Sequence, residues 1–350
     1  MASAGLALGT GDLLGAPISV SQRKAAADKV KIAYVGIGNR GEQIIGDFAR
    51  TGMVEVVALC DVDMGAPHTQ KVMNMYPKAK RFRDFRQMFD KAGNDFDAVA
   101  IATPTTPTFL SPCWLWHPVS MSMWKSLWRV HSMRRNCLCS CIERPNLVTQ
   151  VGNQGHSEAN YFQFKAWMDA GIIKDVTAVT AHMNNPRRWH GWDSGIYKLP
   201  SGQQLPNDMD WDTWLGVVPY HEYNKDYHLG QWRCWYDFGM GCLGDWGAHI
   251  LDTVHEFLEL GLPYEVSMQY ANGHNDYFFP YSSTILFRFP QRKGMPPVDI
   301  TWYDGLDNLP PIPEAMGCQA LIQYSQNKSG RHTGCQIKPG KDYLYKRPGF

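Results

Sequence analysis

The stretch Val35-Gly36-Ile37-Gly38-Asn39-Arg40-Gly41 decides the fold. This G-x-G-x-x-G run directly follows the apolar segment 30–35 and precedes residues 42–49, whose apolar side chains recur at helical spacing. A second apolar segment, 54–60, ends at Asp61. A strand, a glycine turn, a helix, a strand and an acid in this order predict a βαβ unit that binds a dinucleotide.

Each residue of the run has a physical role in such a unit. Gly36 permits the tight turn, Gly38 leaves room for a pyrophosphate beside the backbone, and Gly41 allows close packing of the helix on the strand. The helix N-terminus offers unpaired N–H groups and the positive end of the helix dipole. Asn39 and Arg40 lie at this N-terminus, so we include both with the three glycines as candidate cofactor-binding residues.

Asp61 lies about 20 residues after the last glycine, where the dinucleotide fingerprint expects an acid for the ribose hydroxyls. This acid favours NAD over NADP, because its charge would repel a 2′-phosphate. A glycine run alone is often only a turn, but here both strands, the helix and the acid are in register. The sequence therefore predicts NAD as the cofactor.

The alternation of strands and helices continues as far as residue 104. Residues 96–102 have the pattern of a buried strand, which ends at Thr103 and Pro104. This alternation indicates an α/β fold with a parallel, doubly wound sheet of the Rossmann type, and such sheets bind ligands at the carboxyl ends of their strands. We therefore expect Thr103 and Pro104 to line the cofactor site.

The overall composition excludes several classes of protein. The 350 residues suffice for two domains with cores of their own. A formal net charge of +1 and the lack of a basic block argue against nucleic acid or an anionic membrane surface as a partner. No run is long and apolar enough to span a bilayer. The nine cysteines show no spacing typical of a disulfide framework. The 13 tryptophans fit either a sugar-stacking cleft or ordinary core packing.

Residues 1–29 differ in composition from the rest of the chain. Residues 2–9 resemble the apolar part of an export signal, but the charged start of such a signal is absent. We interpret the segment as the remnant of an export signal, with a disordered tail as the alternative. Export and a cytoplasmic location both stay open on this sequence.

From residue 156 onward the sequence predicts a second domain. The segment 176–182 alternates like a strand with one solvent-facing side and ends at His182. Three further strand-like runs predict an open, mostly antiparallel sheet: 264–270, 282–289 and 298–302. The chain would thus consist of a dinucleotide-binding domain (30–155) and an α+β domain (156–350).

The loop after His182 carries Arg187, Arg188 and Trp189. Guanidinium groups can fork hydrogen bonds to hydroxyls and an indole ring can stack on a sugar face, so this loop suits a hydroxyl-rich ligand. Together with His182, these three residues are the candidate substrate contacts. A surface loop without function is an equal alternative.

Asp245 and His249 form the sharpest constellation of the second half. A helix that starts near Gly244 places these two residues four apart on one face. An acid beside an imidazole holds the tautomer of the ring and poises a proton acceptor near neutral pH. The alternative is a capped helix with a surface histidine.

Together these segments resemble the Gfo/Idh/MocA family of NAD(P)-dependent oxidoreductases, over roughly residues 30–104 and 145–315. The residues that carry the resemblance include Gly36–Gly41, Asp61, Thr103, Pro104, Asp245 and His249. In particular, these segments resemble the exported bacterial branch of the family, which includes NAD-dependent glycosidases similar to glycoside hydrolase family 109.

The resemblance implies roles for particular residues. Asn153, which follows the strand-like segment 144–151, would contact the nicotinamide side of NAD, with a polar turn as the alternative. Asp245 and His249 would act at the substrate, beside a lysine from a Glu-Lys-Pro strand. The substrate would be a small carbohydrate, and members of the family tend to form homo-oligomers through the open sheet.

Residues 105–143 do not fit the family. The Glu-Lys-Pro strand belongs here, whereas this segment is rich in Cys, Trp and Met and lacks Gly. Read two nucleotides later, the codons of residues 118–128 permit Gly-Lys-His-Val-Tyr-Val-Glu-Lys-Pro-Leu, because Met123 and Trp124 have single codons that force Val and then Glu. We hypothesise that residues 105–143 are translated out of frame. Resequencing the gene would refute this if the reading frame proved intact, with no compensating insertion or deletion nearby. A weaker pattern in residues 342–350 suggests a second shift that truncates the chain.

This hypothesis changes two local interpretations. Cys137, Cys139 and Cys141 could form a thiolate metal cluster, but no His or second Cys pair lies at ligand spacing, so we predict no metal site. Lys125 is not the family lysine in register, so we assign it no catalytic role.

The sequence leaves three hypotheses about function open. In the first, an oxidoreductase, NAD takes hydride from a carbinol carbon of a sugar while His249 takes the hydroxyl proton. In the second, a glycosidase, transient oxidation permits elimination and no net NADH accumulates. In the third, the chain is an inactive or unstable relic, because a sheet without the Glu-Lys-Pro strand leaves buried polar backbone groups unpaired at about 1–3 kcal/mol each.

Overall fold

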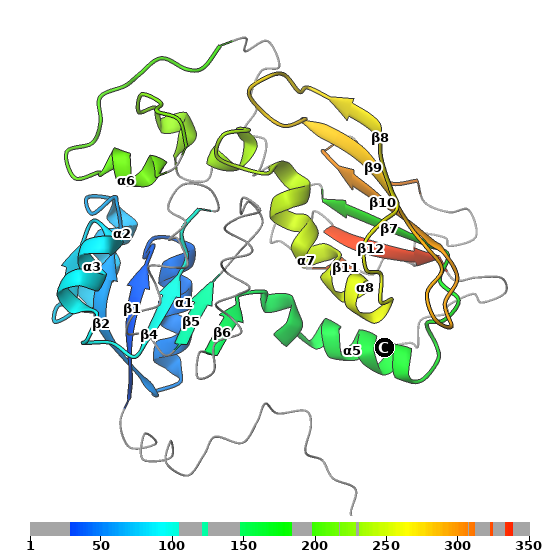
Figure 1. The fold of residues 1–350 in the computed structure, drawn as a ribbon, viewed down its shortest axis with the longest axis horizontal. Helices are drawn as coiled ribbons and strands as arrows, with labels where there is room; N and C mark the ends of the chain where they lie inside the picture. The colour runs from blue at the N-terminus through cyan, green and yellow to red at the C-terminus, as the bar shows by residue number, and fades with distance from the viewer. Residues whose placement is uncertain are drawn as a thin grey trace, which may run out of the picture.

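The computed structural model describes residues 29–104, 121–124, 148–183, 198–216, 218–228, 231–306, 308–311, 323–324 and 333–338. Two six-stranded sheets lie side by side in these residues (Figure 1). The proposed substrate residues Arg187, Arg188 and Trp189 lie outside the described residues, as do Lys125 and the cysteines 137, 139 and 141.

The first sheet has the strand order β3-β2-β1-β4-β5-β6, and every neighbouring pair is parallel. This confirms the predicted Rossmann-type sheet. Its strands are β1 (Val30–Val35), β2 (Val54–Cys60), β3 (Lys80–Phe82), β4 (Ala98–Ile101), β5 (Met121–Trp124) and β6 (Val148–Val151). Its helices are α1 (Arg40–Arg50), α2 (Pro67–Met75) and α3 (Phe85–Ala92).

Both faces of this sheet are buried, as expected for parallel strands covered by helices. Successive residues of β1 enter different clusters. Ala33 and Val35 pack with side chains of α3, whereas Ile32 and Tyr34 pack with side chains of α1 and α2. The sequence of β1 is therefore nearly all apolar because both of its faces pack against helices.

The expectation that the parallel sheet has a gap is wrong. β5 fills it, with Met121 to Trp124 in register with Ala98 to Ile101 of β4 on one side and with Val148 to Val151 of β6 on the other. The hydrogen bonds of a sheet join backbone groups. A segment whose side chains lack strand-like periodicity can therefore still pair with a strand on each side. The sheet is thus continuous through the segment that does not fit the family.

The second sheet has the order β11-β12-β7-β10-β9-β8. Only β7 and β10 run parallel, and the other neighbours are antiparallel, which confirms the predicted mostly antiparallel sheet. Its strands are β7 (Ala178–Met183), β8 (Glu265–Asn272), β9 (Ser282–Phe289), β10 (Val298–Asp304), β11 (Gln323–Tyr324) and β12 (Thr333–Lys338).

Short helices cover one face of the second sheet (Figure 1). They are α7 (Ala248–Ile250) and α8 (Asp252–Phe257), and α5 (Ala159–Asp169) packs beside them. Val179, Ala181 and Trp302 of the sheet share a core with Ile250 and Val254 of these helices. The helix that carries His249 is therefore fixed by its apolar side against the sheet.

A further core consists mainly of aromatic side chains from the segment 209–238. Trp211 and Trp214 of α6 (Trp211–Leu215) stack with ring centroids 4.5 Å apart. They pack with Tyr227 and Phe238, and Val62 of the first domain joins the same cluster. Core packing, rather than an open stacking cleft, thus accounts for these tryptophans.

Candidate active site

The turn after β1 leaves no room for side chains at its first and third glycines. Gly36 has φ +77°, and a Cβ there would lie 2.9 Å from the carbonyl carbon and oxygen of Ala102 and 3.0 Å from the backbone nitrogen of Thr103. A Cβ at Gly41 would lie 2.0 Å from the carbonyl oxygen of Gly36. The turn, the helix start and the end of β4 therefore meet at backbone contact distance, which places Thr103 and Pro104 beside the turn.

The N-terminus of α1 begins from an unusual residue. Asn39 has φ +46° and its side chain makes no capping hydrogen bond, so it caps no N–H group of the first turn. The Arg40 side chain turns along the helix, where Nη1 donates to Oε1 of Gln43 at 2.8 Å. The Asn39 side chain therefore does not occupy the helix N-terminus, where the sequence predicts that an anion binds.

Asp61 directly follows β2 and forms hydrogen bonds that stabilise the glycine turn. Its Oδ2 accepts from the backbone N–H of Ile37 at 2.9 Å, and its Oδ1 accepts from the N–H of Asp63 at 3.0 Å. Burial raises the pKa of the Asp61 carboxyl, and these two hydrogen bonds act in the opposite direction. Each oxygen has a further lone pair, so the same carboxylate can also accept from ribose hydroxyls.

The geometry of this cradle fits a dinucleotide. In this cradle (Gly36–Gly41 and Asp61), added Cβ atoms would collide with Ala102 at Gly36, with the His68 ring at Gly38 and with the Gly36 carbonyl oxygen at Gly41. The Asp61 carboxylate is bonded to the same turn through the N–H of Ile37. Backbone donors match a diphosphate and the acid matches a ribose.

Asn153 and His249 meet across the two domains. Nδ1 of His249 lies 3.1 Å from Oδ1 of Asn153, and Nδ2 of Asn153 donates to the carbonyl oxygen of Ala248 at 3.3 Å. The carbonyl fixes the amide orientation, so Oδ1 must accept from Nδ1–H of the ring. A neutral imidazole in this tautomer carries its lone pair on Nε2, where it can accept a proton.

Asp245 lies in a π-helical turn and not in an ordinary α-helix. Residues Leu243–Gly247 form a π-helical turn before α7, a local geometry that is frequent at functional sites. Oδ1 of Asp245 pairs with Nε of Arg233 at 3.1 Å. Asn153, which sequence reasoning assigned only to the cofactor, is a hydrogen-bond partner of His249.

A second contact joins the same two elements, and sequence reasoning missed it. Nε2 of His156 lies 2.5 Å from Oδ2 of Asp252 and 3.7 Å from Oε2 of Glu256. The His156 ring also stacks on Tyr161, with the centroids 4.9 Å apart. The turn after β6 and the helix after His249 are therefore tied together at two points.

His182 is buried in β7 between two core residues. It is 4% exposed, and its neighbours Ala181 and Met183 enter the core under α7 and α8. Since successive side chains of a strand point to opposite faces, His182 points to the face away from His249. Strand alternation was visible in the sequence, but nothing there showed which face carries the helices.

Asp304 is a buried carboxyl that sequence reasoning also missed. It is 3% exposed at the end of β10, where its Oδ2 accepts from Nε1 of Trp302 at 2.7 Å and from Oγ of Ser283 at 2.8 Å. Burial raises its pKa to about 6 in spite of these hydrogen bonds. A lone acid after a strand gives no signal in a sequence.

Other expectations concern metals and membranes. Among the residues that the structure describes, no three His, Cys, Asp or Glu side chains gather at a metal-binding geometry. Within the same residues, no helix has the length and apolar character needed to cross a bilayer. Cys60, Cys234 and Cys242 are buried.

Comparison with known proteins agrees with this architecture. The C-terminal alpha/beta domain of the Gfo/Idh/MocA oxidoreductase family matches residues 159–289. Residues 159–289 thus match the C-terminal domain of this oxidoreductase family. Its fold is similar to an oxidoreductase from Thermotoga maritima (TM-score 0.54, 13% identity, 81% of this chain and 74% of that one). It is also similar to the WlbA dehydrogenase from Thermus thermophilus, solved with NAD and UDP-GlcNAcA (TM-score 0.51, 14% identity, 79% and 74%).

The curated relatives with similar sequences are glycosyl hydrolase family 109 proteins. Protein 1 from Akkermansia muciniphila is 23% identical over 173 residues, which are 44% of this chain and 33% of that protein. Protein 2 from Shewanella sp. (strain ANA-3) is 28% identical over 97 residues, 26% of this chain and 19% of that protein. The matched part of the chain therefore spans a third or less of the length of these relatives.

Proposed function

We propose that this chain is an NAD-dependent oxidoreductase that acts on a carbinol carbon of a sugar or sugar derivative. The contact between Asn153 and His249 carries the proposal, because it places an oriented proton acceptor beside the carboxyl end of a strand of the cofactor-binding sheet. Bound NAD would supply the hydride acceptor. The carbohydrate class is supported by relatives named as glycosyl hydrolases and by a structural neighbour solved with UDP-GlcNAcA.

The residues of the chain divide the work. The glycine cradle and Asp61 hold the cofactor, and Thr103 and Pro104 line its crevice. His249 accepts the hydroxyl proton at Nε2, while Asn153 holds the ring in the required tautomer. Asp245, paired with Arg233, fixes the π-helical turn that precedes His249.

Two further parts of the proposal concern the substrate and the assembly. Arg187, Arg188 and Trp189, in the loop after β7, are the proposed substrate contacts. We also propose homo-oligomers that form through the second sheet, because its edge strand β8 exposes large apolar side chains. These are Val266, Met268 and Tyr270.

The names of the curated relatives favour a second candidate function, an NAD-dependent glycosidase. In that reaction the oxidation is transient and the aglycone leaves by elimination, so the nicotinamide returns to its starting state. Incubating the chain with NAD and a panel of sugars and aryl glycosides separates the two reactions. Net NADH absorbance supports the oxidoreductase, and aglycone release without net NADH supports the glycosidase.

The frameshift hypothesis supplies a control for this assay, a frame-restored version of the chain. A version of the gene with the reading frame restored across residues 105–143 would regain the Glu-Lys-Pro lysine. If the restored version turns over and the present chain binds NAD without turnover, the present chain is an inactive relic. Equal turnover of both would refute the relic hypothesis, and turnover by neither would refute the proposed function.

A further inference from the structure

The imidazole of His68 lies against the second glycine of the cradle. A Cβ at Gly38 would lie 2.1 Å from Cδ2 and 2.4 Å from Nε2 of this ring. Because the pyrophosphate of a dinucleotide passes close to the second glycine of this motif, the side-chain face of Gly38 marks its path. In this chain a histidine side chain borders that path, and neither the motif nor the family resemblance assigns it a role.

Local structure fixes the direction of His68. The residue is second in α2, directly after Pro67, whose ring presets the backbone for the first helical turn. The loop before it is also fixed, because Oδ1 of Asp63 accepts from the backbone N–H of Ala66 at 3.1 Å. The ring therefore reaches the glycine turn from a helix whose start is well determined.

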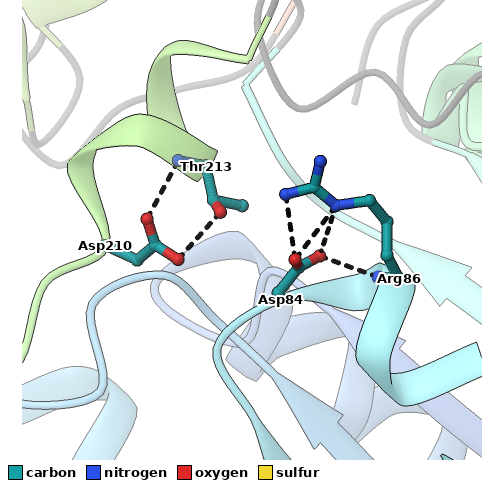
Figure 2. Close-up of polar contacts among 4 residues, drawn as sticks. All are labelled: Asp84, Arg86, Asp210 and Thr213. Carbon is teal, nitrogen blue, oxygen red and sulfur yellow. Dashed lines mark hydrogen bonds and ion pairs between the residues drawn. The ribbon is translucent and has the colours of Figure 1, made fainter.

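The second half of the chain holds this loop from the other side. Asp63 and Met209 form an antiparallel bridge, Asp210 N–H donates to Val62 O at 2.8 Å, and Met64 N–H donates to Asp208 O at 3.1 Å. We call this contact the clasp. Figure 2 shows its continuation, in which the Asp210 carboxylate caps α6 through Thr213 and lies near the Asp84–Arg86 pair of the first domain.

Two titratable groups, Asp61 and His228, interact with His68. Asp61 lies close enough for the His68 ring to lower the pKa of its carboxyl, against the larger effect of burial. His228 comes from the second half, and its ring packs edge-on against Trp214 at 6.1 Å. Burial lowers the pKa of His228, Asp63 raises it, and His68 lowers it further, so these side chains form one cluster at the cradle.

We propose that His68 is a side-chain ligand for the diphosphate of NAD, in addition to the backbone donors of the glycine turn. An imidazole N–H donates to phosphate oxygens, and protonation adds a positive charge. The inference rests on the proposed cofactor, and it names a contact that the G-x-G-x-x-G motif does not include. The clasp keeps the ring at the cradle by holding the loop that precedes α2.

Three ligands separate a phosphate contact from a structural role. Calorimetric titrations of the parent chain, His68→Ala and His68→Gln would use NAD, ADP-ribose and adenosine as probes. His68→Ala should weaken NAD and ADP-ribose about tenfold and leave adenosine unchanged, as expected for one lost charge-assisted hydrogen bond. His68→Gln keeps an N–H donor and should lose less. His274→Ala, an exposed residue after β8, is the matched control and should bind like the parent chain.

Each other outcome overturns a distinct claim. Unchanged or tighter ADP-ribose binding by His68→Ala would mean that the ring only fills space. An equal loss for adenosine and ADP-ribose would mean that His68 acts through the fold. The melting temperature of each variant, measured alongside, shows whether a loss of binding is a loss of folding, and His68→Gln then decides. If the parent chain binds neither NAD nor ADP-ribose, the proposed cofactor fails and this inference fails with it.

Discussion

The glycine cradle and the Asn153–His249 contact are built in opposite ways. In the cradle, the brace between Ile37 and Asp61 joins residues 24 positions apart within one βαβ unit. Asn153 and His249 lie 96 positions apart and meet only because two domains pack together. The first region is a property of a short stretch of sequence, whereas the second is a property of the whole fold. Substitutions should therefore act locally and severely in the first region, and through long-range coupling in the second.

The largest effect should come from Gly36→Ala. The new Cβ would lie 2.9 Å from the Ala102 carbonyl at a φ of +77°. We expect a loss of about 2–4 kcal/mol in the free energy of unfolding and no NAD binding, because both backbone strain and overpacking act at once. Urea denaturation and calorimetry measure the two effects.

Gly52→Ala is the matched control for this prediction. Gly52 has φ +70°, but a Cβ there meets no atom within 4 Å. Only the backbone penalty of about 1–2 kcal/mol should remain, with NAD binding retained. Equal losses at both glycines would show that the close approach of β4 to the turn contributes nothing.

Asp304→Asn should show the next largest effect, and only as a function of pH. The folded-state pKa of about 6 is above the ordinary value of 3.8, so folding favours the protonated acid. Its stabilising contribution is complete below pH 3.8 and is lost as pH rises through 6. The parent chain should therefore lose up to about 3 kcal/mol relative to Asp304→Asn between pH 4 and pH 7. Parallel urea titrations of both chains would contradict this if their difference did not change with pH.

The contrast between the two regions also explains what could be predicted from the sequence. Gly36, Gly38 and Asp61 could be identified because each has a residue type that its local geometry demands. The mixed second sheet could be predicted because its strands alternate. Local pattern was therefore sufficient wherever the structure is local.

The long-range features could not be predicted in this way. The contact between Asn153 and His249 depends on how β6 meets α7. The face of β7 that the helices cover is also a tertiary property, so the sequence could not show on which face His182 lies. β5 was missed for the opposite reason. Its backbone pairs on both sides although its sequence has no strand periodicity, so sheet topology overrides local preference there.

A double-mutant cycle tests the long-range region directly. Asn153→Ala and His249→Ala each remove one side of the same contact, so their effects on unfolding free energy should not add. We expect a coupling of about 0.5–1.5 kcal/mol, the net value of one hydrogen bond in a protein. Additive effects would show that Asn153 does not orient the ring. Asn153→Ala combined with His274→Ala is the uncoupled reference pair.

The smallest effect should come from the ion pair at the clasp. Arg83 and Asp208 lie 2.7 Å apart, but their side chains are 49% and 60% exposed, so solvent screens them. Arg83→Ala should cost no more than about 1 kcal/mol, as should Lys165→Ala, which breaks an exposed pair within a single helix. If backbone hydrogen bonds hold the clasp, the Arg83–Asp208 pair contributes no more to stability than the Lys165–Asp169 pair. The urea midpoints of the two variants should then agree. A clearly larger loss for Arg83→Ala would show that side-chain charge, rather than the Asp63–Met209 bridge, joins the second half of the chain to the cradle.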